Sequence, residues 1–326
     1  MEGIRFSIIV PLFNEEAVIE ACHERLFAVM DSLGESWEII YVNDGSRDRT
    51  AQLARGLCEA DTRVKLISFS RNFGHQAAIT AGMDHASGDA VVIIDADLQD
   101  PPELIPLMIE RWRQGYEVVY GHRIARQGES ARKKISARLY YRLLRRITDV
   151  DIPVDVGDFR LIDARVCAAL ATMPEHNRYV RGLISWLGYR QTFVDYERAP
   201  RYAGKTKYPL RKMMKLAIDG ITSFSYKPLK MGIGIGVALS IASFCFLLFV
   251  FIARLFDLVV MEPGYASLMC VILFFCGIIL IMLGIIGEYI GRIFEEVKGR
   301  PLYVVCDRMG SFGRQKRDPI SKHSDP

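Results

Sequence analysis

The chain has 326 residues, of which half are hydrophobic and a quarter are charged, and its formal net charge at pH 7 is +4. This length allows one large domain with additional segments, and so small a net charge gives no indication of a nucleic-acid partner. The hydrophobic residues are unevenly distributed, because residues 231–253 and 263–287 contain no charged side chain. We therefore expect a soluble domain combined with membrane-spanning segments.

The first part of the chain alternates between apolar runs and helical segments. The predicted strands are 6–12, 38–42, 64–69, 90–94 and 117–120. Helices are predicted over 16–33 and 76–86 and from Pro101 onward, where proline fits the first turn of a helix. Ser46 follows the turn at Asp44 and Gly45 and is expected to cap another helix. Such alternation predicts an α/β fold, with a mostly parallel sheet and helices on both faces.

Two aspartates directly follow the fourth predicted strand. Residues 95–100 read Asp-Ala-Asp-Leu-Gln-Asp and come after the apolar run 90–94. Because ligands of open α/β sheets bind beyond the carboxyl ends of the strands, Asp95 and Asp97 are candidates to share one divalent cation. Carboxylate oxygens suit Mg²⁺ or Mn²⁺, which keep waters and bind substrate phosphates. The segment predicts a metal–diphosphate site, and a loop with two solvated acids is the alternative.

Other nucleotide-binding and hydrolytic motifs are absent from the sequence. The turn at 11–16 contains no glycine, whereas a Rossmann dinucleotide site needs G-x-G-x-x-G after its first strand. The glycines at 232, 234 and 236 lie in a charge-free stretch, where small residues favour close helix packing. Neither a Walker A motif nor a G-x-S-x-G elbow occurs. These observations argue against a dehydrogenase, a P-loop NTPase and a hydrolase of the elbow type.

Each charge-free stretch is long enough, at ~1.5 Å per residue, to cross a hydrocarbon core of ~30 Å. We therefore predict two transmembrane helices, and a pair of buried core helices is the alternative. Apolar residues of 209–224 fall on one helical stripe opposite lysine and arginine, which predicts a helix lying in the membrane interface, with an ordinary surface helix as the alternative. Lysine and arginine gather outside the two spans, and the connecting loop 254–264 holds one arginine and two acids. Both termini are therefore expected in the cytoplasm.

Several short motifs occur in the order found in family 2 glycosyltransferases with a GT-A fold, a Rossmann-like fold. They are VPLFNE at 10–15, NDGS at 43–46, DADLQ at 95–99 and GDFR at 157–160. RNFG at 71–74, GKTKY at 204–208 and GEYIGR at 287–292 resemble the polyprenyl-phosphate glycosyltransferases, the group of bactoprenol glucosyltransferases and dolichol-phosphate mannose synthases. The resemblance extends to about Val305. The expected organisation is a cytoplasmic catalytic domain at 1–208, an amphipathic juxtamembrane helix at 209–229, two spans within 230–290 and a cytoplasmic tail at 291–326.

The resemblance implies roles for residues within these motifs. The nucleotide sugar would contact Pro11, Phe13, Glu15, Asp44, Asp95 and Ala96. The metal would be held by Asp95, Asp97 and Gln99. Asp158 would stand beside the acceptor as the candidate base, with Asp97 as the second catalytic residue. Phosphate groups would be bound by Arg123, Arg132, Arg201 and Lys207, and Lys133 and Lys134 are alternatives to Arg132.

Two of these assignments have alternatives that the residues leave open. A phosphomonoester acceptor has a second pKa of ~6 and is already largely anionic at neutral pH. Asp158 could therefore orient groups instead of acting as a strong base, or be a structural acid paired with Arg160. For His75, which precedes a predicted helix, a packing or helix-start contact is favoured over a catalytic role.

The expected function is the inverting transfer of a hexose, with glucose from UDP-glucose as the first choice, to undecaprenyl or another polyprenyl phosphate. The reaction would use Mg²⁺ or Mn²⁺ at the cytoplasmic face of a bacterial inner membrane, modify cell-envelope glycans, and involve a homo-oligomer. Other donor sugars (N-acetylglucosamine, mannose or aminoarabinose types), a processive polysaccharide synthase and a non-catalytic membrane assembly protein are the alternatives. Processive synthases carry Q-x-x-R-W, whereas Met108 stands where that glutamine would precede Arg111 and Trp112.

Overall fold

The computed structural model describes residues 4–124, 156–176, 178–197 and 264–312, together with separate positions between 229 and 252. The chain forms two compact units. The first, which we call the sheet unit, comprises Met1–Tyr141, Val150–Arg211 and Pro301–Pro326. The second, the helical unit, comprises Arg142–Asp149 and Lys212–Arg300.

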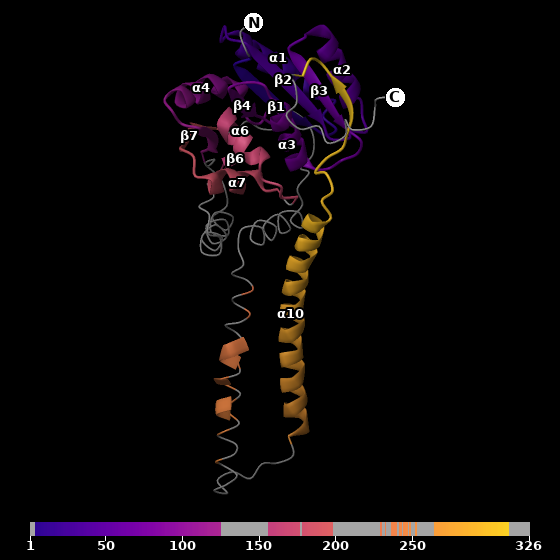
Figure 1. The fold of residues 1–326 in the computed structure, drawn as a ribbon, viewed down its shortest axis with the longest axis vertical. Helices are drawn as coiled ribbons and strands as arrows, with labels where there is room; N and C mark the ends of the chain where they lie inside the picture. Colours follow the sequence, from indigo (N-terminus) through magenta and orange to yellow (C-terminus); the bar gives the residue numbers. More distant parts are fainter. Residues whose placement is uncertain are drawn as a thin grey trace. The chain divides into compact units, whose positions relative to one another are not determined.

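An eight-stranded sheet forms the centre of the sheet unit (Figure 1), with its strands in the order β7-β5-β6-β4-β1-β2-β3-β8. The strands are β1 Phe6–Leu12, β2 Trp37–Asn43, β3 Val64–Phe69, β4 Ala90–Ile93, β5 Val118–Arg123, β6 Val156–Asp163, β7 Gln191–Tyr196 and β8 Val305–Met309. β1 pairs in parallel with β2 and β4, as does β2 with β3 and β5 with β7. β6 runs antiparallel to β4 and β5, and β8 runs antiparallel to β3. The sheet is therefore mixed, and the prediction of a mostly parallel sheet missed these two reversed strands.

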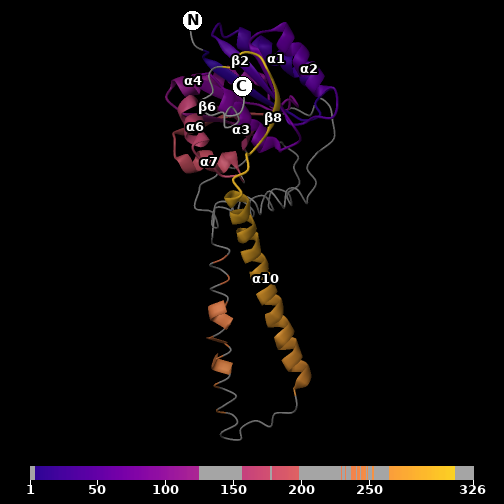
Figure 2. The same cartoon turned by 45° about the vertical axis from the view of Figure 1, so that its right-hand side comes forward.

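Helices cover both faces of this sheet, as the alternation of the sequence predicted (Figures 1 and 2). α1, α2 and α4 lie on one face, and α3, α6 and α7 lie on the other. The helices are α1 Ile19–Asp31, α2 Thr50–Ala60, α3 His75–His85, α4 Ile105–Arg113, α6 Ala164–Ala171 and α7 Val180–Leu187, and the short 3₁₀ turn Pro102–Leu104 precedes α4. Pro102 stands at the start of that turn, where its missing N–H is not needed.

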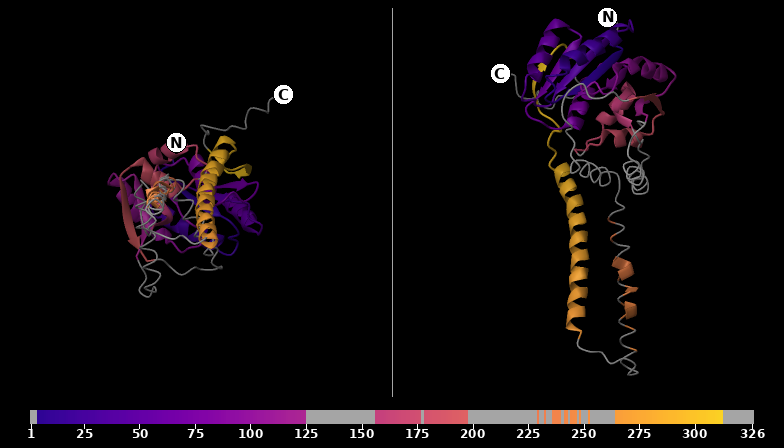
Figure 3. Two further views of the ribbon diagram at one scale, coloured as in Figure 1. Left: turned by 90° about the horizontal axis from the view of Figure 1, so that it is seen from below. Right: turned by 180° about the vertical axis from the view of Figure 1, so that it is seen from behind.

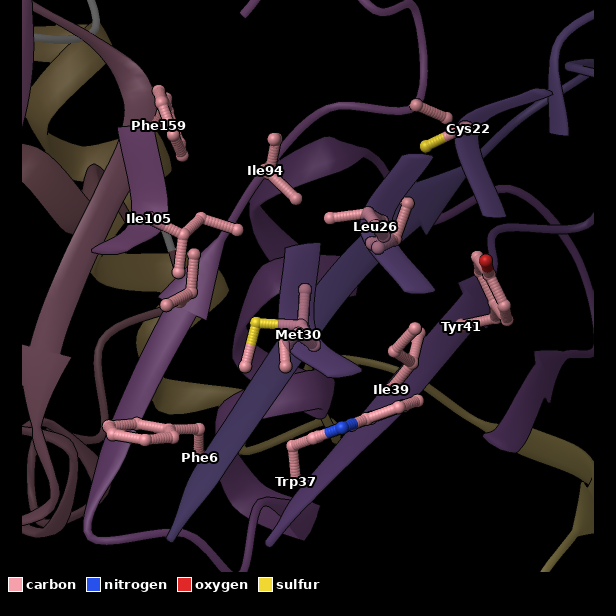
Figure 4. Close-up of a cluster of buried hydrophobic side chains, with 14 of the residues drawn as sticks. Phe6, Cys22, Leu26, Met30, Trp37, Ile39, Tyr41, Ile94, Ile105 and Phe159 are labelled. Atoms are coloured by element: carbon pink, nitrogen blue, oxygen red, sulfur yellow. The ribbon is translucent and has the colours of Figure 1, made fainter. Parts of the chain in front are cut away.

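The core between the sheet and α1 follows directly from the helical spacing of apolar residues. Ile19, Cys22, Leu26 and Met30 are all buried and recur every three or four residues, so they share one face of the helix. Figure 4 shows Cys22, Leu26 and Met30 over the strands, in the same cluster as Phe6, Trp37, Ile39, Tyr41 and Ile94. Fully burying one large apolar side chain stabilises the fold by about 1.5–3 kcal/mol. This packing fixes the strand ends at which the polar motifs lie.

The predicted helix cap at Ser46 is wrong. α2 begins only at Thr50, whose backbone N–H donates to Asp48 Oδ1 at 3.0 Å. Ser46 Oγ instead accepts a hydrogen bond from the backbone N–H of Asn14 at 3.0 Å. The serine therefore ties together the loops that follow β1 and β2.

The segment that the sequence analysis assigned to a C-terminal tail contributes β8 to the edge of the sheet. β8 pairs with β3, with Leu66 opposite Met309 and Phe69 opposite Val305. The strand is short and alternates between half-buried and exposed residues, so it lacks the continuous apolar run that marked the other strands. The sheet unit thus includes residues from beyond the apolar segments as well as from before them.

The helical unit contains α10, Tyr265–Val297, which Figure 3 shows as one continuous helix. Within the part of the chain that the structure describes, it is the one helix long and apolar enough to cross a membrane, over Phe274–Val297. A shorter apolar helix covers Gly236–Phe246. One candidate span is therefore seen where two were predicted, and the predicted interfacial helix lies outside the described residues except at position 229.

Candidate active site

Polar loops gather where β1, β2 and β4 end. These strands are parallel neighbours, with Leu12 opposite Asn43 and Ile9 opposite Ile93, so their carboxyl ends share one edge of the sheet. Asp44 directly follows β2, and Asp95 lies two residues after β4. The structure therefore places the predicted nucleotide and metal motifs at the edge where α/β sheets bind ligands.

Asp44 shapes the loop that leads into α3. Its Oδ1 accepts a hydrogen bond from the backbone N–H of Phe73 at 2.6 Å, and its Oδ2 accepts from Gly74 N–H at 3.0 Å and from Asn72 Nδ2 at 2.8 Å. Burial raises the pKa of Asp44, and the two backbone N–H groups act in the opposite direction. The carboxylate therefore holds the loop in place, and its predicted contact with a nucleotide stays a prediction.

The neighbouring turn requires glycine. Gly45 has φ +64°, and a Cβ atom there would lie 2.5 Å from the carbonyl carbon of Arg71. Any other residue would clash with the backbone and strain the turn. The close approach brings the loops that follow β2 and β3 together.

His75 joins two carboxylates from different strands. Its Nε2 lies 3.2 Å from Asp158 Oδ2 and 3.5 Å from Asp95 Oδ1. The pairing of β4 with β6 explains the meeting, because Ile93 lies opposite Arg160, Asp95 comes two residues after Ile93, and Asp158 comes two residues before Arg160 on the antiparallel strand. The sequence analysis favoured a packing or helix-start contact for His75; the structure places it at the start of α3, with Nε2 within ion-pair distance of two of the predicted site acids.

The three groups change one another's pKa values. Burial opposes protonation of His75, but Asp95 and Asp158 raise its pKa to about 9. Burial, helped by the neighbouring carboxylates, raises the pKa of Asp95 to about 6. Burial alone would also raise the pKa of Asp158, yet His75, Arg160 and Arg181 hold it well below its usual range. Asp158 is therefore ionised and only weakly basic at neutral pH.

Two arginines complete the surroundings of Asp158. Arg160 is fully buried; its Nη2 forms an ion pair with Asp158 Oδ1, and its Nε donates to the Asp158 carbonyl at 3.1 Å. Arg181, from α7, places Nη2 3.8 Å from the same Oδ1. Arg160 Nη1 and Arg181 Nε are buried and have no hydrogen-bond partner among the described residues. Buried unpaired donors are costly, so both atoms are candidates to bind an anion.

Arg160 was visible in the GDFR motif, but nothing in the sequence marked Arg181. Its approach to Asp158 depends on how α7 packs in the folded chain. A search for arginines near the motifs would have passed over it, because it lies more than twenty residues after Asp158.

The loop after β4 offers oxygen atoms that fit a divalent cation. Asp97 Oδ1 accepts a hydrogen bond from Gln99 N–H at 3.1 Å, and Leu98 between them has φ +57°, a left-handed conformation that leucine rarely adopts. Asp95, Asp97 and Gln99 supply carboxylate and amide oxygens, the donor type that Mg²⁺ and Mn²⁺ prefer. In the described residues no group of three or more histidine, cysteine or acidic side chains is arranged to hold a metal. The donor chemistry of Asp95, Asp97 and Gln99 fits a divalent cation, and their predicted role as metal ligands stays a prediction.

Arg123 has structural partners in the fold. Its Nη2 lies 3.1 Å from Asp100 Oδ2, and its Nε donates to the Tyr196 hydroxyl at 3.0 Å. Tyr196 in turn donates to Asp100, which is buried, and the carboxylate raises the pKa of Arg123 against the effect of burial. The predicted phosphate contact of Arg123 stays a prediction, and Arg132, Arg201 and Lys207 lie outside the described residues.

The remaining predicted nucleotide residues surround the same edge. Pro11 is buried near the end of β1, and Phe13, which follows that strand, is 36% exposed. The backbone N–H of Glu15 donates to Thr50 Oγ1 at 2.8 Å, which fixes this loop to the start of α2. Ala96, between Asp95 and Asp97, is buried.

Comparison with known proteins agrees with the motifs. Residues 7–170 match the family model described as Glycosyl transferase family 2, and residues 227–293 match the GtrB C-terminal hairpin. The chain belongs to glycosyl transferase family 2. The family assignment covers β1 to β6 and with them the loops of Asp44 and Asp95 and the strand that carries Asp158.

Two relatives match nearly the whole chain. The uncharacterized glycosyltransferase YkcC of Bacillus subtilis is 54% identical over 94% of this chain and 95% of its own length. A prophage-derived bactoprenol glucosyl transferase of Shigella flexneri is 41% identical over 93% of this chain and 97% of its own length. Among solved structures, a complex of Mycobacterium tuberculosis glucosyl-3-phosphoglycerate synthase with Mn²⁺, UDP and glucosyl-3-phosphoglycerate is 18% identical, with a TM-score of 0.47 over 67% of this chain and 78% of the other.

Proposed function

We propose that this family 2 glycosyltransferase transfers a hexose from a nucleotide sugar to a polyprenyl phosphate. Relatives named bactoprenol glucosyl transferase, 39–41% identical over about nine-tenths of the chain, support this acceptor class. The observation that carries the proposal is the position of His75 between Asp95 and Asp158. His75 thereby connects the loop of Asp95, which suits a diphosphate donor, with Asp158, a carboxylate that is surrounded by cationic side chains.

On the donor side, the residues at the ends of β1, β2 and β4 bind and orient the nucleotide diphosphate. Asp95, Asp97 and Gln99 hold Mg²⁺ or Mn²⁺, which when bound stabilises the negative charge on the departing diphosphate. Pro11, Phe13, Glu15, Asp44 and Ala96 line the nucleotide.

On the acceptor side, Asp158 orients groups and is not required as a strong base. A phosphate monoester has a second pKa of ~6 and so reaches the site largely ionised. The pKa of Asp158 lies well below its usual range because of His75, Arg160 and Arg181, which makes it a poor proton acceptor. Its negative charge instead keeps the surrounding cations in place. The unpaired donor atoms of Arg160 and Arg181 can then bind the acceptor phosphate, together with Arg123, Arg132, Arg201 and Lys207.

The finer assignments follow from the same proposal. Glucose from UDP-glucose is the first choice of donor, and N-acetylglucosamine, mannose and aminoarabinose donors are the alternatives. The reaction takes place at the cytoplasmic face of a bacterial inner membrane, through a homo-oligomer with two spans and both termini in the cytoplasm. A polyprenyl phosphate lies in that membrane, where the apolar segments after residue 230 would hold the enzyme.

The test is transfer of label from a panel of radioactive nucleotide sugars to lipid. The purified full chain is incubated with undecaprenyl phosphate or with undecaprenol, and the label is counted in the organic phase. We expect label from one UDP-hexose, with the phosphate acceptor only. An Asp97→Asn variant should lose the signal, while Asp31→Asn, a change of an exposed acid paired with Arg63, should keep it. Efficient transfer to the free alcohol, or no lipid label from any donor, would overturn the proposal.

A further inference from the structure

The segment Tyr303–Phe312, which we call the C-terminal clasp, packs against the strand that leads into the site loop. Its β8 lies beside β3 in the sheet (Figure 1). The backbone N–H of Ser70 donates to Val304 O at 3.0 Å, and Cys306 Sγ donates to Ser68 O at 3.4 Å. The clasp therefore continues to the last residue before the loop 71–74.

Tyr303 contacts the elements on both sides of this loop. Its ring stacks on Phe69, with centroids 5.0 Å apart and planes 17° apart. Its hydroxyl donates to Asp84 Oδ2 at 2.8 Å. Phe69 ends β3 and Asp84 lies in the last turn of α3. One side chain thus connects the strand before the loop with the helix after it.

The contacts continue from Tyr303 to the candidate active site. Phe69 packs edge to face on Phe73, with ring centroids 5.7 Å apart. The backbone N–H of Phe73 is the group that donates to Asp44 Oδ1 at 2.6 Å. Gly74 follows with φ +103°, and His75 then begins α3. The conformation of the loop depends on Phe73, and Phe73 is held by Asp44 on one side and by Phe69 on the other.

We propose that Tyr303 is a positioning residue for nucleotide binding. By fixing Phe69 and the end of α3, it holds the loop 71–74 against Asp44 and so preorganises the edge of the donor site. This inference rests on the proposed function, because it assumes that Asp44 and its loop face the nucleotide.

A simple structural role predicts something different. If the clasp only stabilised the sheet, removing one of its contacts would at most lower the melting temperature and would leave nucleotide affinity unchanged. The ion pair between Arg55 and Asp307, 2.6 Å long and exposed, provides a matched control on β8 because it ties that strand to α2 and not to Phe69 or α3.

The experiment measures binding of UDP in the presence of Mn²⁺ by calorimetry, using the full chain in detergent. Tyr303→Leu removes the stacked ring and should weaken UDP binding by about 5–10-fold, the size expected for one lost aromatic pair. Tyr303→Phe keeps the stacked ring and loses only the bond to Asp84, so it should weaken UDP binding less than Tyr303→Leu, which loses both contacts. Arg55→Ala should bind UDP like the unchanged protein.

Hydrogen exchange gives a readout that does not depend on the nucleotide. The amides of Phe73 and Gly74, which donate to Asp44, should exchange faster in Tyr303→Leu and at the original rate in Arg55→Ala. If Tyr303→Leu does not fold, Tyr303→Met, which keeps most of the buried volume, takes its place with the same expectation.

The inference is overturned if the folded variant binds UDP as tightly as the unchanged protein and keeps its amide protection. It is also overturned if Arg55→Ala weakens binding equally. A failure of the unchanged protein to bind any of UDP, GDP and CMP would instead contradict the proposed function, and the exchange rates would still test the link from Tyr303 to the loop.

Discussion

The Nε2 atom of His75 lies 3.2 Å from Oδ2 of Asp158, so the first residue of α3 is joined by an ion pair to β6. The two residues are 83 positions apart in the chain. Because the same nitrogen also lies 3.5 Å from Asp95 Oδ1, the pair connects the metal loop with the acceptor side of the proposed site.

The charge of His75 should therefore matter more than its shape. His75→Gln removes the cation and should lower kcat/KM by about 10–100-fold, as expected for the loss of a charge-assisted contact of about 1.5–3 kcal/mol. His75→Lys keeps a positive charge and should recover part of this loss. Steady-state kinetics with both substrates check the prediction, and equal activity of the glutamine and lysine variants would contradict it.

The same contact predicts how stability depends on pH. The folded-state pKa of His75 is about 9, above its usual value of 6.5, so its contribution to stability is complete below pH 6.5 and is lost as the pH rises to about 9. In metal-free buffer the melting temperature of the unchanged protein should fall over this range relative to that of His75→Gln. If the melting temperatures of the two proteins change by the same amount between pH 6.5 and 9, the prediction that His75 is protonated in the folded protein is contradicted.

Much of the fold could be predicted from the sequence because its central strands are continuous apolar runs. Phe6–Leu12 and Val64–Phe69 have the predicted bounds, since both strands are buried along their whole length. β6 was not predicted as a strand, because Asp158 and Arg160 interrupt its apolar pattern. Those two charges are tolerated in the sheet because they pair with each other, a fact that local sequence does not reveal.

The candidate site could be predicted only where a motif lies at a strand end. Asp44 and Asp95 follow strands that the pattern identified, so their common edge could be expected. The contact between His75 and Asp158 depends on the antiparallel pairing of β4 and β6. The contact between Arg181 and Asp158 depends on how α7 packs in the folded chain. No pattern in the neighbouring sequence indicates either contact.

Arg181 should affect the acceptor more than the donor. Arg181→Ala is expected to raise the KM for polyprenyl phosphate by about 10-fold or more, the effect of losing a charge-assisted hydrogen bond, and to leave the KM for the nucleotide sugar nearly unchanged. Arg190→Ala is the matched control, because Arg190 is exposed and packs on Tyr116. An equal rise in both KM values for Arg181→Ala would show that the residue does not distinguish the two substrates.

Asp97 and Asp100 lie three residues apart, but replacing each by asparagine should have different effects. Asp97→Asn should reduce turnover without destabilising the fold, whereas Asp100→Asn should destabilise the fold. Asp97→Asn keeps an oxygen that can accept from Gln99 N–H, so the fold should keep its melting temperature. Turnover should fall by a factor of at least ~100, since the amide is a poor substitute for a carboxylate that holds a divalent cation. Kinetics over a range of Mn²⁺ concentrations test this, and near-normal turnover of the folded variant would rule out Asp97 as a metal ligand.

Asp100→Asn should instead destabilise the fold. Asp100 is buried and pairs with Arg123 and Tyr196, so the substitution leaves a guanidinium without its counter-charge. Breaking a buried ion pair from one side costs about 3–5 kcal/mol, whereas an exposed pair contributes about 0–1 kcal/mol. Asp307→Asn, which breaks the exposed pair with Arg55, is therefore the control and should leave the denaturation midpoint nearly unchanged. Equal midpoints for Asp100→Asn and Asp307→Asn would mean that the Asp100–Arg123 pair does not stabilise the fold, and Arg123 would then be available for the phosphate contact predicted from the sequence.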